Sequence, residues 1–527
     1  METDRMQQHA RLVGALRARL GGGAVETIET HISTVLLAGE FAYKLKKPVD
    51  LGFLDFTTLA ARRRFCEQEL QLNRRTAPQL YLDVLAITGT VDAPRLGGPG
   101  APIDWAVRMR RFAAEDLLDA RVRAGRLDAA CIDRLAAAIA AVHMGAPRVD
   151  AASALGSAGT VARWLLDNVE GLREHVGASV DRARIDALAD WTRRELERRA
   201  ALLQARHRDG FVRECHGDLH LGNIVLVDGA PIPFDCIEFN DELRCIDVLS
   251  DLAFTVMDLL DRAEPRLAWR LLNGYLEATG DYGAVPLARP YLVYRALVRA
   301  KVALIRAQQP AVAPALRVHQ HGDFADHVAL AERLARPGPP LLVAMHGLSG
   351  SGKTFVAQQL LEHLGAVRVR SDVERKRMFS LAPNARVDAE LRAELYGGDA
   401  TRATYERLAS AARAIVDGGF TAIVDAAFLK HAERAALRAL AGSLGVRFAL
   451  VACSAPPAVL RARVAARVAA DRDASDATLD VLERQLGWCE DVQDDERAVA
   501  WRINTDAPFD EVARRCGALA GALAATH

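Results

Sequence analysis

The sequence has no net charge, no long apolar run and no paired cysteine motif, and each absence excludes a class of protein. Lys plus Arg and Asp plus Glu both total 68, so no overall basic field favours nucleic acid or anionic lipid. No apolar run approaches the ~20 residues that span a bilayer, and the polar, acidic residues 1–5 are not a secretory signal. The eight cysteines contain no C-x-x-C pair, which favours neither a disulfide framework nor a four-thiolate zinc site. We therefore expect a cytoplasmic protein with reduced thiols, no membrane association and no general affinity for nucleic acid.

The chain is too long for a single hydrophobic core. Its 527 residues are 50% hydrophobic and 26% charged, which is an ordinary globular composition, but single cores stop growing near ~250–300 residues. The clearest boundary is the segment 336–340, where prolines remove hydrogen-bond donors and fix φ. We predict one unit at 1–335, a linker at 336–340 and a second unit at 341–527. The sequence does not specify an oligomeric state.

The two predicted units differ in their pattern of apolar residues. In the first, strand-like patterns and a charged amphipathic helix at 58–75 indicate a small mixed lobe at about 25–113, followed by a mostly helical lobe at 114–335. In the second, short apolar segments alternate with helical ones, which predicts βαβ crossovers and a parallel sheet. The predicted strands lie at 33–51, 84–90, 106–112 and 224–235 in the first unit and at 341–345, 366–370, 421–424 and 447–452 in the second.

A first group of polar residues surrounds a predicted hairpin. The string HGDLHLGN at 216–223 precedes two short apolar runs that are joined by the turn signal Asp228-Gly229. The hairpin should bring Asn223, at the start of the outgoing strand, beside Asp235, at the end of the returning strand. Mg²⁺ takes one or two protein oxygens and completes its octahedron with water and phosphate, which suits this pair. Asp218 could then orient a substrate hydroxyl and accept its proton.

This string resembles the catalytic loop of the aminoglycoside phosphotransferase and choline kinase branch of the protein-kinase-like folds, whose local signature is H-G-D-x-x-x-x-N. The resemblance covers roughly residues 25–325 and implies an α+β protein-kinase-like (aminoglycoside phosphotransferase) domain that uses ATP and Mg²⁺. It implies that Asp218 is the catalytic base and that Asn223 and Asp235 hold Mg²⁺. Asp235 begins Asp-Cys-Ile-Glu rather than D-F-G, as is usual in that branch.

The same resemblance points to a lysine and a glutamate that bind the nucleotide phosphates. The segment FAYKLKK at 41–47 looks like the strand that bears the phosphate-gripping lysine. The family's A-x-K pattern favours Lys44, with Lys46 on the same strand face as the alternative. The partner glutamate is expected on the helix at 58–75, where we prefer Glu69 to Glu67. No G-x-G-x-x-G precedes Lys44, so no nucleotide-covering loop is assigned.

Three aspartates follow the hairpin, namely Asp247, Asp251 and Asp258, and they make the next predicted helix acidic. Two interpretations stay open. A carboxylate cluster beside the site would suit a cationic acceptor such as an aminoglycoside. Alternatively, these carboxylates support the catalytic loop or face water.

A second group of residues forms a glycine-rich loop. The string GLSGSGKT at 347–354 fits G-x-x-x-x-G-K-[ST] at every position, and it follows a predicted strand and precedes a predicted helix. Backbone N–H groups of such a loop close around phosphates at the positive end of the helix. Lys353 would reach the β- and γ-phosphate oxygens, and the Thr354 hydroxyl would ligate Mg²⁺. The candidate nucleotide-binding residues are Gly347, Ser349, Gly350, Ser351, Gly352, Lys353 and Thr354.

Carboxylates follow two other predicted strands of this unit. Asp372 and Asp425 stand at strand carboxyl ends, which face the ligand crevice of an open α/β sheet. The unit looks like the small-molecule and polynucleotide kinases, similar to gluconate kinase and zeta-toxin-type kinases, which implies an α/β P-loop kinase domain with a parallel sheet. The resemblance implies that Asp372 is the base for the acceptor hydroxyl. It also implies that Asp425 is the carboxylate near Mg²⁺, although Asp425 could equally contact substrate.

Two arginines precede a loop that is placed like a lid. Arg463 and Arg467 lie one turn apart on a predicted helix that ends near residue 470, and the polar loop 471–476 follows. The planar guanidinium fork suits phosphate oxygens, so we predict that both arginines bind the nucleotide phosphates. The alternative is that they reflect the general abundance of arginine in this chain.

Together, these observations predict a bifunctional ATP-dependent phosphotransferase, in which each unit moves the γ-phosphate of ATP to a hydroxyl of an unidentified small-molecule acceptor. One alternative is a single active kinase that a P-loop switch or ATPase regulates, although a switch has no need of a hydroxyl-activating carboxylate such as Asp372. Another is a P-loop unit that acts on a nucleotide or polynucleotide, which the balanced charge does not support. A pseudokinase scaffold conflicts with the intact Asp218, Asn223 and Asp235.

Overall fold

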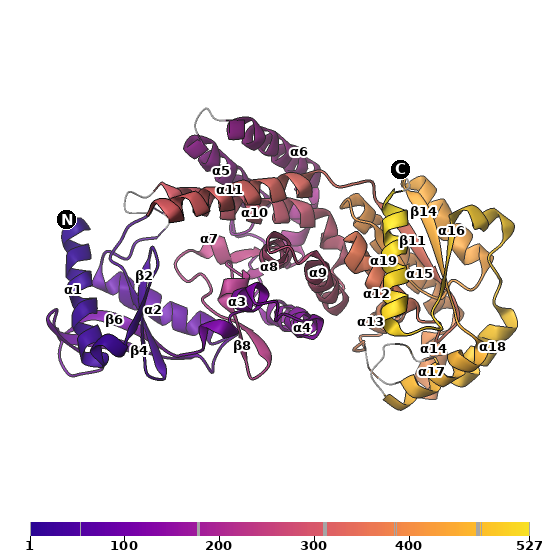
Figure 1. Ribbon diagram of the computed structural model, residues 1–527, viewed down its shortest axis with the longest axis horizontal. Coiled ribbons are helices and arrows are strands. Elements are labelled where there is room, and N and C mark those ends of the chain that lie inside the picture. The colour runs from indigo at the N-terminus through magenta and orange to yellow at the C-terminus, as the bar shows by residue number, and fades with distance from the viewer. Residues whose placement is uncertain are drawn as a thin grey trace. The chain divides into compact units, whose positions relative to one another are not determined.

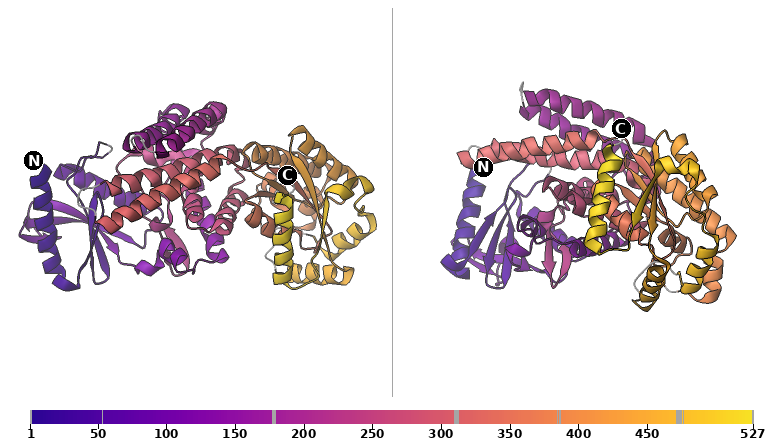
Figure 2. Two further views of the ribbon diagram at one scale, coloured as in Figure 1. Left: turned by 45° about the horizontal axis from the view of Figure 1, so that its top comes forward. Right: turned by 45° about the vertical axis from the view of Figure 1, so that its right-hand side comes forward.

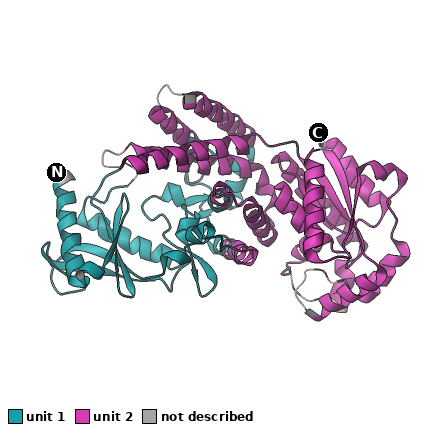
Figure 3. Ribbon diagram, viewed as in Figure 1, with its two compact units in different colours: residues 1–127, 141–164, 200–255 teal, residues 128–140, 165–199, 256–527 magenta. Residues whose placement is uncertain are grey.

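The computed structural model describes residues 2–52, 54–176, 180–308, 313–383, 385, 387–470, 475 and 477–525. They form two compact units, each made of several chain segments (Figure 3). The first unit comprises residues 1–127, 141–164 and 200–255, and the second comprises residues 128–140, 165–199 and 256–527. The second unit thus contains residues 256–335 together with the glycine-rich loop and the strands around it. The domain boundary at 336–340 stays a prediction.

The described residues of the first unit form one large antiparallel sheet, two small sheets and several helices. Its elements are α1 (Glu2–Leu20), η1 (Gly22–Ala24), β1 (Glu26–Glu29), β2 (Ser33–Ala38), β3 (Phe41–Lys46), α2 (Leu59–Asn73), β4 (Tyr81–Thr90), β5 (Ala93–Leu96), β6 (Pro102–Arg110), η2 (Ala114–Asp116), α3 (Leu118–Arg123), β7 (Val212–Glu214), η3 (Leu221–Asn223), β8 (Ile224–Val227), β9 (Ala230–Pro233), α7 (Asp241–Arg244) and β10 (Cys245–Asp247). The large sheet has the strand order β1-β2-β3-β6-β4-β5, and β7 pairs with β10 and β8 with β9.

Side-chain alternation along β3 separates two faces of the large sheet. Leu45 packs with Leu12 of α1 on one face. Ala42 packs with Cys66 of α2 on the other face. Because alternate residues of a strand point the same way, Lys44 lies on the face that α2 covers.

Four helices contribute residues to both units, because the division between the units falls within them. They are α4 (Ala129–Gly145), α5 (Ala158–Val176), α6 (Val180–Arg208) and α8 (Val248–Asp261).

The remaining elements belong to the second unit alone. They are α9 (Pro265–Thr279), η4 (Tyr282–Leu287), α10 (Ala288–Ala307), α11 (Pro314–Ala335), β11 (Leu341–His346), α12 (Lys353–Leu364), β12 (Val367–Arg370), α13 (Ser371–Met378), α14 (Ala389–Leu395), α15 (Gly398–Asp417), β13 (Ala422–Asp425), α16 (His431–Ser443), β14 (Arg447–Ser454), α17 (Pro457–Ala470), α18 (Leu479–Trp488), η5 (Asp494–Val499), β15 (Ala500–Asn504) and α19 (Phe509–Ala525).

These strands form a five-stranded parallel sheet in the order β12-β13-β11-β14-β15. Helices α12 and α19 share a hydrophobic core with the sheet, and α15 and α16 contact its strands. The yellow helix α19 runs beside the sheet in every view (Figure 1, Figure 2). Since β13 and β14 flank β11 on opposite sides, the order of strands reverses at β11. The carboxyl ends of the strands next to such a reversal form the ligand crevice of open α/β sheets.

The predicted fold class, an α+β kinase-like part followed by an α/β P-loop part with a parallel sheet, is confirmed. The four strands predicted in the second unit correspond to β11, β12, β13 and β14. Sequence analysis missed α1, whose buried face is small (His9, Leu12, Val13 and Leu16). It also missed the edge strand β15, in which only Ile503 is buried. Among the described residues, no helix combines the length and apolarity needed to cross a membrane.

Candidate active sites

In the first unit, two lysines of β3 share one glutamate of α2. The Nζ atom of Lys44 donates a hydrogen bond to Glu69 Oε1 at 2.9 Å and pairs with the Asp235 carboxylate. The Nζ atom of Lys46 donates to Glu69 Oε2 at 2.7 Å and pairs with Glu238. Both lysines, which sequence analysis left as alternatives, therefore contact Glu69. Glu238 was not predicted, because nothing in its sequence context distinguishes it from a surface glutamate.

Burial and charge pairing oppose each other in this cluster: pairing outweighs burial at Glu69 and Lys44, whereas burial outweighs pairing at Glu238 and raises its pKa. The Glu69 side chain has 0% exposure. Burial alone would raise its pKa, but Lys44 and Lys46 outweigh burial and hold the pKa of Glu69 below its usual range. Burial would lower the pKa of Lys44, but Asp235 and Glu69 raise it well above its ordinary value. Glu67, the other candidate partner, is half-exposed and bonds Arg63 one turn away.

The loop 216–223 holds Asp218 and Asn223 together. Asn223 Nδ2 donates to the backbone oxygen of Asp218 at 2.9 Å and to its carboxylate Oδ2 at 3.0 Å. His220 Nε2 lies 3.5 Å from the same carboxylate oxygen. The Asp218 side chain keeps 38% exposure, so its carboxylate is oriented by the protein and remains open to a small molecule.

The hairpin β8–β9 brings Asp235 back to this loop. The backbone N–H of Phe234 donates to Asn223 O at 2.9 Å, so the two strand ends are neighbours. Asp235 itself has a φ of 63°, a left-handed conformation that is uncommon outside glycine. Its N–H donates to the Tyr81 hydroxyl at 3.1 Å. Long-range contacts thus fix the backbone of Asp235, and Tyr81 is a supporting residue that sequence analysis missed.

The buried aspartate Asp251 supports the loop 216–223 through hydrogen bonds. Asp251 accepts the backbone N–H groups of His216 at 3.0 Å and Gly217 at 2.8 Å, and its Oδ2 lies 3.1 Å from His143 Nε2. Asp247 binds the Arg206 guanidinium through both carboxylate oxygens. Of the two interpretations of the acidic cluster, the geometry favours support of the catalytic loop over contact with a cationic acceptor.

In the second unit, the glycine-rich loop lies between β11 and α12. Gly347, Gly350 and Gly352 have φ values of 143°, 80° and 78°, which favour glycine. Lys353 Nζ donates to the backbone oxygens of Gly347 at 2.8 Å and Leu348 at 2.9 Å. No described side chain caps the first turn of α12, which leaves its N–H groups available for an anion.

Two aspartates stand close enough to Lys353 of this loop to affect its pKa. Burial lowers the pKa of the Lys353 ammonium, and the charges of Asp425 and Asp372 act in the opposite direction. Asp425 ends β13, and Asp372 lies in the first turn of α13 directly after β12. Asp425 is 6% exposed, and its Oδ2 accepts no hydrogen bond from any described residue. A buried carboxylate oxygen of this kind suits a bound Mg²⁺.

Residues far along the chain complete the loop. Gln485 of α18 accepts the backbone N–H of Ser349 at 2.9 Å through its Oε1. Arg463 donates to the Gly350 backbone oxygen at 3.4 Å and to the Thr505 hydroxyl at 2.9 Å. Sequence analysis missed Gln485 and Thr505, which belong to no recognisable motif.

The predicted lid lies only partly within the described residues. Arg467 donates to the Ala477 backbone oxygen at 3.0 Å. Residues 471–474 and 476 of the predicted loop lie outside the described residues. The phosphate-binding roles of Arg463 and Arg467 therefore stay predictions.

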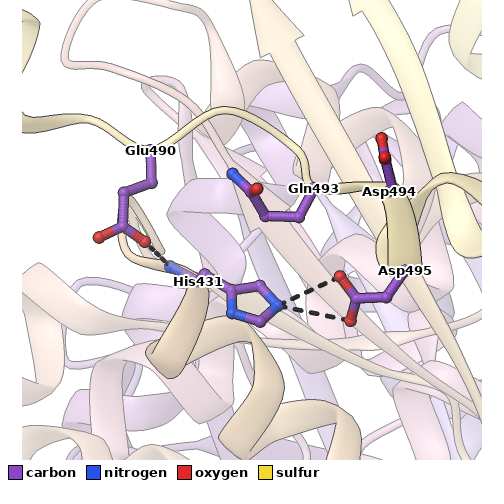
Figure 4. A pocket seen from close by; sticks show the side chains of 5 residues that line it. All are labelled: His431, Glu490, Gln493, Asp494 and Asp495. Atoms are coloured by element: carbon purple, nitrogen blue, oxygen red, sulfur yellow. Dashed lines mark hydrogen bonds and ion pairs between the residues drawn. The ribbon is translucent and has the colours of Figure 1, made fainter.

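The second unit also has an acidic surface pocket that sequence analysis did not predict (Figure 4). The backbone N–H of His431 donates to Glu490 at 2.6 Å, and the His431 ring lies 3.4 Å from Asp495. Gln493 and Asp494 complete the lining. Among the lining side chains, the described pairing is between His431 and Asp495, and we assign no chemistry to this pocket.

Comparisons with known proteins match both halves of the chain. A model described as "Phosphotransferase enzyme family" matches residues 61–287, and one described as "AAA domain" matches residues 342–492. The uncharacterized protein Rv2004c of Mycobacterium tuberculosis is 31% identical over 465 residues, which are 88% of this chain and 91% of that protein.

Solved structures resemble either half. A choline/ethanolamine kinase family protein from Mesorhizobium loti is 16% identical and covers 63% of this chain and 96% of its own, with a TM-score of 0.39. A gluconokinase from Sinorhizobium meliloti 1021 is 24% identical and covers 36% of this chain and 95% of its own, with a TM-score of 0.25.

Proposed function

The chain belongs to one family with the mycobacterial protein and is a kinase with a phosphotransferase domain before a P-loop domain; from this premise we propose that both domains are active. Each would transfer the γ-phosphate of ATP to a hydroxyl group of a small-molecule acceptor. The observation that supports the proposal is that each unit holds a buried lysine near aspartates at strand ends or in a neighbouring loop.

In the first site, Lys44 binds the ATP phosphates, and Glu69 holds it in place at 2.9 Å. Asp218 orients the acceptor hydroxyl and accepts its proton as the phosphoryl group moves. The hydrogen bond that the Asn223 side-chain amide donates to the Asp218 carboxylate, at 3.0 Å, supports this role because it fixes the base before the acceptor arrives. Asn223 and Asp235 would hold Mg²⁺, which would offset the negative charge of the phosphates.

In the second site, the N–H groups of the glycine-rich loop and the Lys353 ammonium bind the phosphates. Asp372 accepts the proton of the second acceptor. Thr354 and Asp425 would hold Mg²⁺, and the Oδ2 of Asp425, which accepts no hydrogen bond from the described residues, supports that assignment. Arg463 and Arg467, which both lie on α17, would bind the phosphate oxygens of the nucleotide.

The experiment is phosphoryl transfer from radiolabelled ATP to pooled sugars, aminoglycosides and oligonucleotides. It compares the wild type with Asp218→Ala, Lys353→Ala and the double variant. We expect each single variant to lose one set of labelled products by at least ~10³-fold and to retain the other, and the double variant to lose both.

Loss of all products in both single variants would contradict two independent sites. If only Asp218→Ala removes products and Lys353→Ala changes their rate, the P-loop domain acts as a regulator. Labelled oligonucleotides that Lys353→Ala abolishes would exclude a small-molecule acceptor for the second site.

A further inference from the structure

A glutamate outside the glycine-rich loop is linked through two arginines to the candidate Mg²⁺ ligands of the second site. Glu277 stands in the last turn of α9, within the region that matches the phosphotransferase family. Its Oε1 lies 2.9 Å from Arg370 Nη1, and its Oε2 lies 3.0 Å from Arg368 Nη2. Burial alone would raise the pKa of Glu277, but the two arginines outweigh burial and hold that pKa below its ordinary value. The carboxylate is therefore ionised at neutral pH.

The two arginines connect Glu277 to both candidate Mg²⁺ ligands. Arg368 Nη1 donates to the backbone oxygen of Thr354 at 3.3 Å. Arg370 is the register partner of Asp425 on the neighbouring strand, and its Nε lies 3.8 Å from Asp425 Oδ2. That oxygen is the buried one without a hydrogen bond among the described residues.

Helix α9 is attached firmly enough to β12 to define this geometry. Asn273, one turn before Glu277, hydrogen-bonds backbone groups at the β12 edge of the sheet. Its Nδ2 donates to Ala366 O at 2.9 Å, and its Oδ1 accepts the Arg368 N–H at 2.7 Å. In return, Arg377 of α13 donates to backbone oxygens at the carboxyl end of α9. The carboxylate of Glu277 is thus held relative to β12 by independent hydrogen bonds.

We propose that Glu277 is a positioning residue for the P-loop site. It holds Arg370 beside Asp425 but out of hydrogen-bond reach of Asp425 Oδ2, so that this oxygen stays available to a divalent cation. The inference rests on the proposed MgATP site of the second domain. A guanidinium 3.8 Å from a buried carboxylate is strongly attracted to it. The competing pull of Glu277 keeps the arginine from closing that gap. Without it, Arg370 and the cation would compete for the same oxygen.

The test measures metal binding rather than turnover. Binding of a fluorescent ADP to the full chain is titrated with Mg²⁺, and the part of the signal that Lys353→Ala removes is taken as the P-loop signal. We expect Glu277→Gln to raise the Mg²⁺ concentration for half of the metal-dependent gain in affinity by about tenfold, with little change in affinity in EDTA. The double variant Glu277→Gln/Arg370→Gln should return to within about twofold of the wild type.

Glu362→Gln is the matched control. Glu362 of α12 is buried and binds two arginines of the same helix α9, namely Arg266 and Arg270, but it adjoins no candidate metal ligand. We expect it to leave the Mg²⁺ requirement unchanged. A Glu277→Gln variant that matches Glu362→Gln, or a double variant without recovery, would overturn the inference.

A third variant keeps the test decisive if Glu277→Gln does not fold. Arg370→Gln alone should lower the Mg²⁺ requirement, because it removes a positive charge beside Asp425; an unchanged or higher requirement would count against the inference. If the wild type has no Mg²⁺-dependent signal that Lys353→Ala removes, the proposed function of the P-loop domain fails instead.

Discussion

The two sites place their lysines in opposite ways. Lys44 pairs with two carboxylates, Glu69 and Asp235, that lie 25 and 191 residues away in sequence. Lys353 bonds two backbone oxygens only five and six residues away. The first site therefore depends on charge pairing between distant side chains, whereas the second depends on the backbone path of one short loop. Substitutions of buried charges should damage the first site, and changes of backbone conformation should damage the second.

The largest expected effect is the loss of the shared carboxylate in the first unit. Glu69→Ala leaves two buried ammonium groups each without one partner, and breaking a buried ion pair in this way typically lowers the free energy of unfolding by about 3–5 kcal/mol. Chemical denaturation followed by circular dichroism should show one transition that moves to a lower denaturant concentration than in the wild type. That transition is assigned to the first unit. Nucleotide binding at the P-loop should stay unchanged.

Glu67→Ala on the same helix is the control for this prediction. Its partner Arg63 is exposed, and such surface pairs contribute only about 0–1 kcal/mol. Equal destabilisation by the two alanine variants would show that the buried network is not what stabilises the first unit.

The second prediction concerns the backbone of the glycine-rich loop. A Cβ atom added at Gly347 would lie 2.4 Å from the Cys453 backbone oxygen, at a φ of 143°. Gly347→Ala must therefore move the loop, and strain of about 1–3 kcal/mol predicts a loss of ADP affinity at the P-loop of about 5- to 150-fold, measured by calorimetry. Products that depend on Asp218 should persist.

Gly521→Ala in α19 is the matched substitution in the same unit. No described atom lies within 4 Å of a Cβ added there, and alanine favours a helix by about 0.5–1 kcal/mol. ADP affinity should not change. Unaltered ADP binding in Gly347→Ala would mean that the loop conformation is not what recognises the phosphates.

The third expected effect is a dependence of stability on pH in the first unit. His9 of α1 is buried, with Nε2 3.1 Å from Thr34 Oγ1. Burial, with Lys47 and Arg62 nearby, lowers its pKa from 6.5 to about 4. Because the unfolded chain binds this proton more readily, stability is complete above pH 6.5 and declines as the pH falls toward 4, by up to about 3 kcal/mol.

Denaturation of the wild type and His9→Gln at pH 7.5 and pH 4.5 measures this effect. Glutamine does not titrate, so the variant should lose less stability on acidification in the transition that Glu69→Ala identifies. The same decline in both proteins would assign the acid sensitivity to other groups.

Contiguous motifs made part of both sites predictable. The glycine-rich loop and the spacing from Asp218 through Asn223 to Asp235 are local patterns, in which residue type and sequence distance already specify the geometry. Glu238, Gln485 and the support of the loop by Asp251 were different, because each acts through a contact with a distant segment.

The sequence by itself determined the fold class and the two phosphate-binding motifs, because hydrophobic periodicity and short motifs involve only residues that are close together in sequence. Only the tertiary structure decided that Glu69 lies between two lysines, and that Glu277, 76 residues before Lys353 by their numbers, lies behind Thr354 and Asp425. The physical reason is that a buried charge is specified by whatever segment packs against it, and no local pattern records that choice.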